Sequence, residues 1–431
     1  MVTCDWFSRL IDFTLLGTAG LANSAQNDLA LHPFKNRPDG TRIFRGQVRA
    51  CLNAKVDQLA NACGLPVGVV ESIQQVVRES SLADATTFVC KYVSTKTAGM
   101  LGMKGGGLNR KATRQLAERT WRERQYCELI YPQFDGTPGR VPQIYGSRFE
   151  AVTDPANAGR FSQPACSSLI VMQDLAENEF TKYKLFQHIP FEEMQPIIDG
   201  LADVHAIIRK QGEDQASQFP EVLYGPFGCG KYRQRIDSSY AACRRRLQQI
   251  KDPGENLKRS LADSETSKML AALQDLSLNQ MLDDHAHLFQ FKTLVHGDVH
   301  GDNIFVQRET GQLCLIDWQV CGVNNPASEL AYLLNYSTNP SPQRDQHFLE
   351  TYHKAWCESM NRYSPECKTD YSLADLKVGF QVCTALLLKM TIVHSNPRRA
   401  NRIHKILLDR MLFRMLERTK EFSRDSGFLS N

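Results

Sequence analysis

The stretch that decides the fold is LVHGDVHGDNIFV, Leu294–Val306, followed closely by LCLIDWQ, Leu313–Gln319. Each stretch contains a short apolar run that leads into polar residues, a pattern typical of strands that end in turns. The first strand delivers Asp298 into a polar turn that ends at Asn303, and the second strand presents Asp317 at its end. Because residues 309–311 form a tight turn between the two strands, we predict that these three side chains converge on one point.

This set of side chains suits the transfer of the terminal phosphoryl group of a nucleotide. That reaction needs a carboxylate that orients an attacking hydroxyl and accepts its proton, and hard oxygen ligands that hold Mg²⁺ against the phosphates. We therefore expect Asp298 to be the catalytic base and Asn303 and Asp317 to bind Mg²⁺. A bare pattern of His, Asp and Asn also occurs in turns stabilised by Asx hydrogen bonds, so the rest of the chain has to support this interpretation.

The motif resembles that of the aminoglycoside phosphotransferase superfamily. His296-Gly-Asp298, four residues, Asn303 and the downstream Ile316-Asp-Trp-Gln319 carry the resemblance, and the IDWQ ending favours the ecdysteroid kinase-like and choline kinase-like (CHK kinase-like) branch. The resemblance implies an α+β, protein-kinase-like bilobal fold, with a small strand-rich N-terminal lobe and a larger, mainly helical C-terminal lobe. It also implies an enzyme that uses ATP and Mg²⁺ to phosphorylate a hydroxyl group of a small molecule.

Other features of the superfamily appear in the same order along the chain. Lys91 lies in the β-like run Thr87–Val93, where the resemblance places a lysine on the α and β phosphates of the nucleotide. Glu123 matches the helix glutamate that pairs with this lysine. Met172, Gln173 and Asp174 resemble the segment between the lobes, whose backbone groups would meet adenine.

The sequence departs from the superfamily pattern in three ways, of which the first two motivate an alternative function and the third concerns the subfamily. Residues 69–77 are rich in Val and Ile and are interpreted as a strand, which makes residues 78–84 the turn before the lysine strand, and this turn contains no glycine. Only one strand is then recognised before the lysine strand. His300 also stands where the ecdysteroid kinase-like branch often has an aromatic residue. The alternative is a catalytically weak or inactive pseudokinase that acts as a binding scaffold.

The remaining sequence indicates where the two lobes lie. Residues 1–45 are assigned to an N-terminal extension, residues 46–173 to an N-lobe with the nucleotide-binding sheet, and residues 174–431 to a C-lobe with the catalytic and metal-binding loops. Apolar residues recur at helical spacing through most of the chain beyond Leu175. Within that half, residues 265–288 are expected to form one helix.

Composition excludes some classes of partner. The chain of 431 residues has 51 Lys and Arg against 47 Asp and Glu, a net charge of +4, whereas nucleic-acid binders concentrate basic charge. The apolar run Val382–Val393 contains Lys389 and is too short to cross a bilayer. We therefore expect a small-molecule hydroxyl substrate and no nucleic-acid or membrane partner. The 13 cysteines include no CxxC pair, which favours a reduced, cytoplasmic protein. The oligomeric state cannot be predicted.

Two further patterns have ordinary structural explanations. Gly225–Lys231 has the spacing of a phosphate-binding loop, but Pro226 removes a backbone donor and Tyr232 replaces the Ser or Thr that binds Mg²⁺. The basic residues between Arg398 and Arg418 accompany apolar residues at fourfold spacing. They are expected to form a terminal helix with an apolar face on the core and a solvated cationic face.

Overall fold

The chain folds into two compact units, which we describe from a computed structural model. The small unit ends at Phe180 and the large unit runs from Thr181 onward, close to the predicted boundary at residues 173 and 174. Each unit is described by itself. The structure describes residues 31–36, 42–47, 51, 53–63, 65–79, 87–94, 110–134, 141–150, 167–175, 179–185, 187–209, 230–247, 250, 253–365, 371–394 and 402–426.

The small unit is built on a five-stranded antiparallel sheet in the order β1-β2-β3-β5-β4. The strands are β1 (Leu31–Asn36), β2 (Arg42–Gln47), β3 (Thr87–Ser94), β4 (Ile144–Glu150) and β5 (Ser167–Gln173). The central strand β3 is the predicted lysine strand. The strands β2 and β5 pair with β3 on its two sides, and Lys91 lies opposite Ile43 of β2 and Ile170 of β5.

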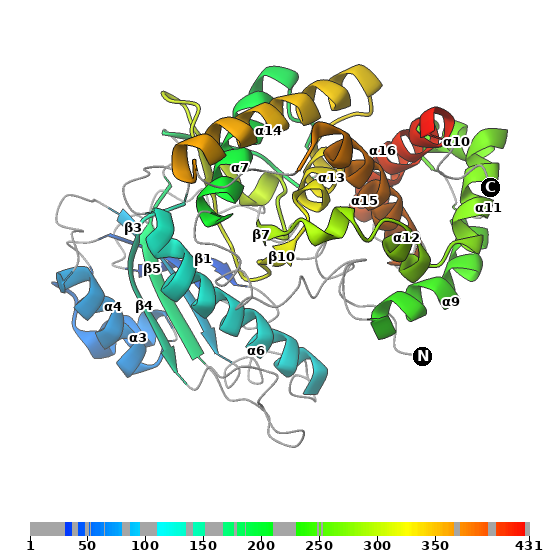
Figure 1. Ribbon diagram of the computed structural model, residues 1–431. Coiled ribbons are helices and arrows are strands. Elements are labelled where there is room, and N and C mark those ends of the chain that lie inside the picture. Colours follow the sequence, from blue (N-terminus) through cyan, green and yellow to red (C-terminus); the bar gives the residue numbers. More distant parts are fainter. Residues whose placement is uncertain are drawn as a thin grey trace. The chain divides into compact units, whose positions relative to one another are not determined.

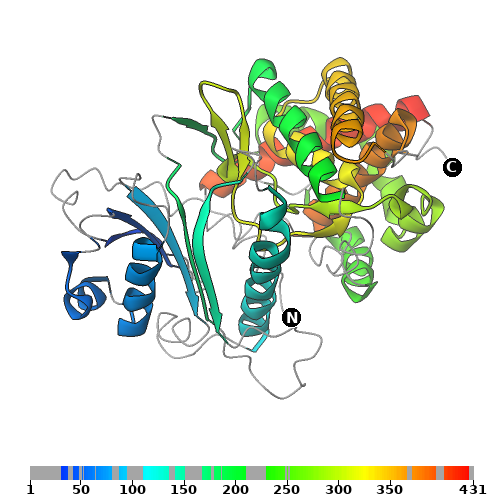
Figure 2. The same cartoon turned by 60° about the vertical axis from the view of Figure 1, so that its left-hand side comes forward.

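Helices cover both faces of this sheet (Figures 1 and 2). On one face, α3 (Val56–Cys63) and α4 (Val67–Glu79) pack against Phe88, Cys90 and Tyr92 of β3. Side chains alternate across a strand, so Lys91 and Val93 point to the other face. There α6 (Arg110–Gln125) runs along the sheet and continues as a π-helical turn, Tyr126–Ile130, and a 3₁₀ turn, Tyr131–Phe134.

The structure corrects the expected start of this sheet. Residues 69–77 belong to the helix α4 and not to a strand, because Val70, Ile73 and Val77 recur at helical spacing and are all buried. Two strands, β1 and β2, precede the lysine strand and lie largely in the range that the sequence analysis assigned to an N-terminal extension. The connection between them, residues 37–41, contains Gly40 and lies outside the described residues.

The large unit is mainly helical. Its helices are α7 (Phe191–Arg209), α9 (Gly230–Leu247), α10 (Glu255–Ala262), α11 (Ser264–Asp275), α12 (Leu278–Asp284), α13 (Pro326–Ser337), α14 (Pro342–Tyr363), α15 (Leu373–His394) and α16 (Arg402–Ser426). Figure 1 shows α7 beside α14, and α15 packed among α9, α13 and α16. The helix expected over residues 265–288 is interrupted, because Ser277 caps the start of α12 with its side chain.

Short strands bring the predicted motif together in this unit. The strand β7 (Thr293–Val295) pairs antiparallel with β10 (Gly322–Asn324). A second, three-stranded sheet has the order β6-β8-β9, from Phe180–Lys182, Ile304–Gln307 and Leu313–Leu315. The turn of the β8–β9 hairpin contains Gly311 at a φ of 69°, in the left-handed region that glycine adopts readily.

The helix α15 is long and apolar enough to cross a membrane, unlike the shorter run considered in the sequence. However, 78% of its most apolar window is buried inside the structure. Its Lys389 forms an ion pair with Asp237 of α9, with Nζ 2.7 Å from Oδ1. These properties are those of the central helix of a folded domain.

The terminal helix α16 differs from the expected amphipathic pattern. Arg414 and Arg418 are buried and do not belong to a solvated cationic face. Arg418 pairs with Asp345 through two of its nitrogens, at 2.7 and 3.0 Å, and donates to backbone oxygens at the C-terminal end of α13. A helix end leaves carbonyl groups without partners, and a guanidinium group satisfies several of them at once.

Candidate active site

The turn after β7 is held by a glutamate from α13. The Glu329 carboxylate accepts the backbone N–H of His296 at 2.9 Å and that of Gly297 at 2.6 Å. His205 of α7 lies 2.9 Å from the same carboxylate through Nε2 and 2.7 Å from Tyr352 Oη through Nδ1. These hydrogen bonds anchor the loop that carries Asp298 to α13 and, through Glu329, to α7 and α14. The side chains of Glu329, His205 and Tyr352 are all buried.

His296 has a structural role in the loop. Its Nε2 donates to the backbone oxygen of Ile316 at 2.8 Å, and its Nδ1 accepts the Asp298 N–H at 3.2 Å. The ring meets Trp318 edge-on, with centroids 4.7 Å apart. His296 therefore joins the two segments of the predicted motif, and both of its nitrogens are used in doing so.

The carboxylate of Asp298 is buried and bound by neighbouring side chains. Its Oδ1 accepts a hydrogen bond from Tyr332 Oη at 3.0 Å and lies 3.3 Å from His300 Nε2. Burial by itself would raise the pKa of Asp298, but the charge and hydrogen bond of His300 outweigh it and hold this pKa below its ordinary value. The same contact holds the pKa of His300 above its ordinary value, although burial by itself would lower it. Asp298 is therefore an anion at neutral pH.

Asn303 lies beside Asp298 at the end of a short 3₁₀ turn, Gly301–Asn303. Its amide nitrogen donates to the backbone oxygen of Asp298 at 3.0 Å and reaches Asp298 Oδ2 at 3.4 Å. Its backbone oxygen accepts the N–H of Ile316 at 3.1 Å. Because the amide nitrogen is used by the loop, the amide oxygen of Asn303 is the atom able to bind a cation.

Asp317 has a φ of 68°, in the left-handed region that non-glycine residues rarely adopt. Its Oδ2 accepts a hydrogen bond from Gln319 Nε2 at 3.2 Å. The preceding residue, Ile316, donates its N–H to the backbone oxygen of Asn303 at 3.1 Å, which places Asp317 next to the segment that carries Asn303. The large unit thus brings Asn303 into contact with Asp298 and joins the backbone next to Asp317 to Asn303.

The oxygen donors of this loop are of the kind that Mg²⁺ binds. Among the residues that the structure describes, no group of three or more His, Cys, Asp or Glu side chains could hold a metal ion. Mg²⁺ usually takes one or two carboxylates, several waters and the oxygens of substrate phosphates. Asn303 and Asp317 supply two hard oxygen donors of this kind.

In the small unit, Lys91 and Glu123 form a buried ion pair. The distance from Lys91 Nζ to Glu123 Oε1 is 2.6 Å, and each side chain is only 6% exposed. Lys91 projects from the face of β3 that α6 covers, and Glu123 lies near the end of α6. The predicted pairing of these two residues is therefore present in the geometry.

Met172 and Gln173 are the last two residues of β5, and Asp174 follows them directly. The Gln173 N–H donates to the Gln143 oxygen at 2.8 Å, so this backbone donor is already used within the small unit. The Asp174 carboxylate pairs with Arg45 of β2, with Nε and Nη2 at 2.8 and 3.0 Å from its two oxygens. The first bond ties the end of β5 to the residue before β4, and the second ties it to β2, on the far side of β3.

Sequence reasoning missed two residues with clear roles. Arg45 was placed in an N-terminal extension, and its only sequence signal is its position directly after the apolar residues Ile43 and Phe44. Tyr332 lies three residues after Glu329 on α13 and therefore on the same face of that helix. This spacing could have shown that the helix which holds the loop also offers a hydroxyl to it.

A match to a family of known proteins extends this description. The model of the ecdysteroid kinase-like family matches residues 140–363, just over half of the chain. The chain belongs to the ecdysteroid kinase-like family. The matched part of the chain includes Asp298, Asn303, Asp317 and Glu329. Lys91 and Glu123 lie before the matched part. No curated protein matches the chain.

Solved structures resemble the chain at low identity. One is the amicoumacin kinase hAmiN in complex with AMP-PNP, Ca²⁺ and Ami, at 12% identity and a TM-score of 0.41, covering 96% of this chain and 95% of that one. An aminoglycoside phosphotransferase from Alicyclobacillus acidocaldarius has 12% identity, a TM-score of 0.40 and coverages of 79% and 85%. The choline kinase LicA from Streptococcus pneumoniae has 13% identity, a TM-score of 0.38 and coverages of 78% and 87%. Membership of the ecdysteroid kinase-like family does not depend on these low similarities.

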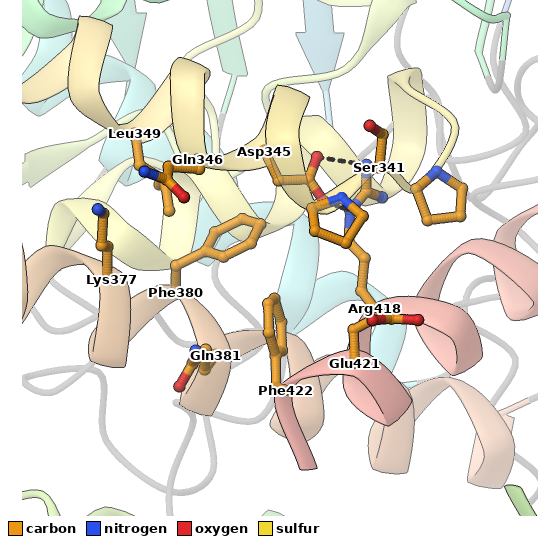
Figure 3. A pocket seen from close by; sticks show the side chains of 12 residues that line it. Ser341, Asp345, Gln346, Leu349, Lys377, Phe380, Gln381, Arg418, Glu421 and Phe422 are labelled. Carbon is orange, nitrogen blue, oxygen red and sulfur yellow. Dashed lines mark hydrogen bonds and ion pairs between the residues drawn. The ribbon is translucent and has the colours of Figure 1, made fainter. Parts of the chain in front are cut away.

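A pocket of about 130 Å³ lies elsewhere in the large unit, between α14, α15 and α16 (Figure 3). Phe380 and Phe422 meet edge-on in it, with centroids 5.7 Å apart, and Figure 3 shows the Asp345 carboxylate directed at the guanidinium group of Arg418. None of the residues that line this pocket belongs to the predicted site.

Proposed function

We propose that the protein is an ATP-dependent phosphotransferase that phosphorylates a hydroxyl group of a small molecule. The observation that carries this proposal is the loop in the large unit, where the buried carboxylate of Asp298 lies beside Asn303, and Asn303 is bonded to Ile316, the residue before Asp317. Family membership supports the same class of chemistry. A carboxylate base beside two metal-binding oxygens is what phosphoryl transfer to an alcohol requires.

In this proposal each residue of the loop has one role. Asp298 orients the acceptor hydroxyl and takes its proton as the oxygen attacks the γ-phosphorus. Asn303 and Asp317 bind Mg²⁺, which neutralises charge on the phosphates when it is bound. Glu329 fixes the backbone of the loop by accepting two of its N–H groups, so that Asp298 keeps its place when substrates bind.

The small unit contributes to nucleotide binding in the same proposal. Lys91 binds the α and β phosphates of ATP, and Glu123 holds the lysine in position through the 2.6 Å ion pair. The end of β5 around Met172, Gln173 and Asp174 meets the adenine ring. Because the Gln173 N–H is already bonded to Gln143, we assign adenine recognition to other backbone groups of this segment.

The test is a search for the phosphorylated product. Purified protein, MgATP and a metabolite extract are incubated, and ATP-dependent phosphorylated products are identified by mass spectrometry. The matched control is Asp298→Asn, which keeps the shape of the side chain but removes the proton acceptor. We expect turnover on any product found to fall about 10²- to 10⁴-fold in this variant. Product formation at the wild-type rate by Asp298→Asn would show that the assignment is wrong.

The scaffold alternative loses much of its support. It depended on a short first sheet and on a turn without glycine, whereas the sheet has five strands and the connection between its first two strands contains Gly40. A thermal-shift titration separates the two functions. A kinase is stabilised by millimolar MgATP, because a ligand that binds the folded state raises its stability, and a scaffold that does not bind nucleotide is not.

A further inference from the structure

The carboxylate of Asp298 is held mainly through one of its two oxygens. Oδ1 accepts the Tyr332 hydroxyl at 3.0 Å and lies 3.3 Å from His300 Nε2, whereas Oδ2 has a longer contact, 3.4 Å, with the Asn303 amide nitrogen. The torsion that rotates an aspartate carboxylate is soft and has broad minima. Two donors on Oδ1 therefore determine the direction in which Oδ2 points.

The position of the Tyr332 hydroxyl is set by its helix and by its ring. Glu329 and Tyr332 are three residues apart on one face of α13, so the helix that holds the loop backbone also reaches the Asp298 side chain. The Tyr332 ring stacks on that of Tyr336, with centroids 4.1 Å apart and planes 16° apart. Burial, together with the nearby Asp298 charge, raises the pKa of Tyr332 well above its ordinary value, so its hydroxyl remains a donor at neutral pH.

We propose that Tyr332 is a positioning residue for phosphoryl transfer: with His300 it holds Oδ1 of Asp298, and so leaves Oδ2 as the oxygen that receives the acceptor's proton. This inference rests on the proposed function, because it requires Asp298 to be the base. In the transfer step the acceptor oxygen forms a bond to the γ-phosphorus. The bond between that phosphorus and the β–γ bridging oxygen breaks, ADP leaves with the electron pair, and the hydroxyl proton passes to Oδ2.

Orientation matters more than basicity in this reaction. The transition state of phosphoryl transfer is loose, so catalysis comes almost entirely from positioning and from electrostatic stabilisation. Tyr332→Phe keeps the stacked ring and removes only the hydroxyl. We expect it to lower kcat about tenfold, because a misplaced catalytic group typically costs one to two orders of magnitude in rate. The KM for ATP should change less than about twofold, since nucleotide binding does not involve Tyr332.

The experiment uses MgATP with water as the phosphoryl acceptor, and the readout is steady-state release of phosphate. Four proteins are compared: wild type, Tyr332→Phe, Tyr240→Phe and Asp298→Asn. Tyr240 is the matched control, because it is also a buried helical tyrosine whose hydroxyl donates to a protein oxygen, that of Leu270 at 3.4 Å. It lies on α9, where its hydroxyl contacts Leu270 and its ring contacts Lys389, neither of which belongs to the loop.

We expect kcat to fall in Tyr332→Phe and to stay at the wild-type value in Tyr240→Phe, with unchanged KM for ATP in both. A wild-type kcat in Tyr332→Phe, or an equal fall in Tyr240→Phe, overturns the inference while the proposed function stands, provided that Asp298→Asn is inactive. If Asp298→Asn releases phosphate as fast as wild type, or if wild type releases none above the Asp298→Asn level, the premise that Asp298 is the base fails and the inference fails with it.

Discussion

Glu329 Oε1 accepts the backbone N–H of Gly297 at 2.6 Å, and this bond joins the helix α13 to the turn that carries the candidate base. Gly297 has a φ of 80°, and a Cβ atom added to it would lie 2.7 Å from the backbone oxygen of Val320. The turn therefore depends on both a left-handed backbone and a close approach of another segment. The motif glycine is required by the structure on two counts.

Gly297→Ala tests this requirement. We expect the free energy of unfolding to fall by about 2–4 kcal/mol, from the left-handed backbone and from overpacking against Val320. Gly311→Ala is the matched control, since its φ is 69° but its added Cβ would meet Pro196 at an ordinary 3.7 Å. It should lose only about 1–2 kcal/mol. The measurement is urea denaturation, and equal losses in the two variants would contradict the argument.

Because the ion pair between Lys91 and Glu123 is buried, loss of one partner should lower the stability of the protein more than loss of both. Removing one partner leaves the other charge in a site that is 6% exposed, so Lys91→Met should lower the free energy of unfolding by about 3–5 kcal/mol. The double variant Lys91→Met, Glu123→Leu removes both charges and should recover part of this loss. Chemical denaturation of the two single variants and of the double variant measures the coupling. A double variant no more stable than Lys91→Met alone would show that the pair is not buried as described.

Asp317→Ala should weaken the binding of nucleotide only in the presence of the metal. Even residues that merely support metal ligands change metal affinity about 10- to 100-fold, so loss of a direct ligand should weaken MgATP binding at least about tenfold. Titration calorimetry with ATP, in the presence and absence of Mg²⁺, gives the comparison. Asp302→Ala is the control on the same loop, because it removes the same charge from a residue whose Oδ1 accepts the Leu185 N–H at 3.2 Å. If both variants lose the effect of Mg²⁺ equally, Asp317 is not a specific ligand.

His394, at the end of α15, should make stability depend on pH. Burial, followed by the charge of Arg235, lowers the pKa of His394 from 6.5 to about 4. Between these two values the unfolded chain binds a proton that the folded chain does not, so this contribution to stability is complete above pH 6.5 and is lost as the pH falls toward 4.

The slope of unfolding free energy against pH measures this effect. Over this window, His394 should contribute up to about 1.4 kcal/mol per pH unit. His394→Gln should therefore show a shallower slope than wild type between pH 4 and 6.5, and the same slope above pH 7. An unchanged slope in the variant would mean that His394 is accessible to protons in the folded state.

Much of the large unit could be predicted from the sequence because its signals are local. The apolar runs around residues 294–306 and 313–319 form the strands β7, β8 and β9. The polar turn between β7 and β8 carries Asp298 and Asn303. The helices α7, α14 and α15 follow the helical spacing of their apolar residues. In these segments, residues close in sequence decide the structure.

The small unit was harder to predict because its local sequence signals are ambiguous. Residues 69–77 contain several β-branched residues, which favour strands locally, yet Val70, Ile73 and Val77 pack as one helical face on the core under the sheet. The strands β1 and β2 were assigned to an extension, because six-residue segments give weak signals without their pairing partners. Packing against the sheet outweighs local preference here.

For the candidate loop as well, some features could be predicted from the sequence and others could not. The identities and spacing of Asp298, Asn303 and Asp317 were visible in the sequence, as was the match of Lys91 to Glu123. The contacts that hold Asp298, from Tyr332 and His300, and the two bonds from Glu329 to the turn were not visible. The contacts of Tyr332 and Glu329 join a helix to a loop that lies 32 to 34 residues earlier in the chain.

The sequence by itself determined which groups could perform the chemistry and which short segments carry them. Only the tertiary structure decided how those groups are oriented: which oxygen of Asp298 is held, which arginine closes the end of α13, and where the first sheet begins. The physical reason is that local patterns encode the burial and alternation of neighbouring residues. Hydrogen bonds between distant segments depend instead on how whole helices and strands pack.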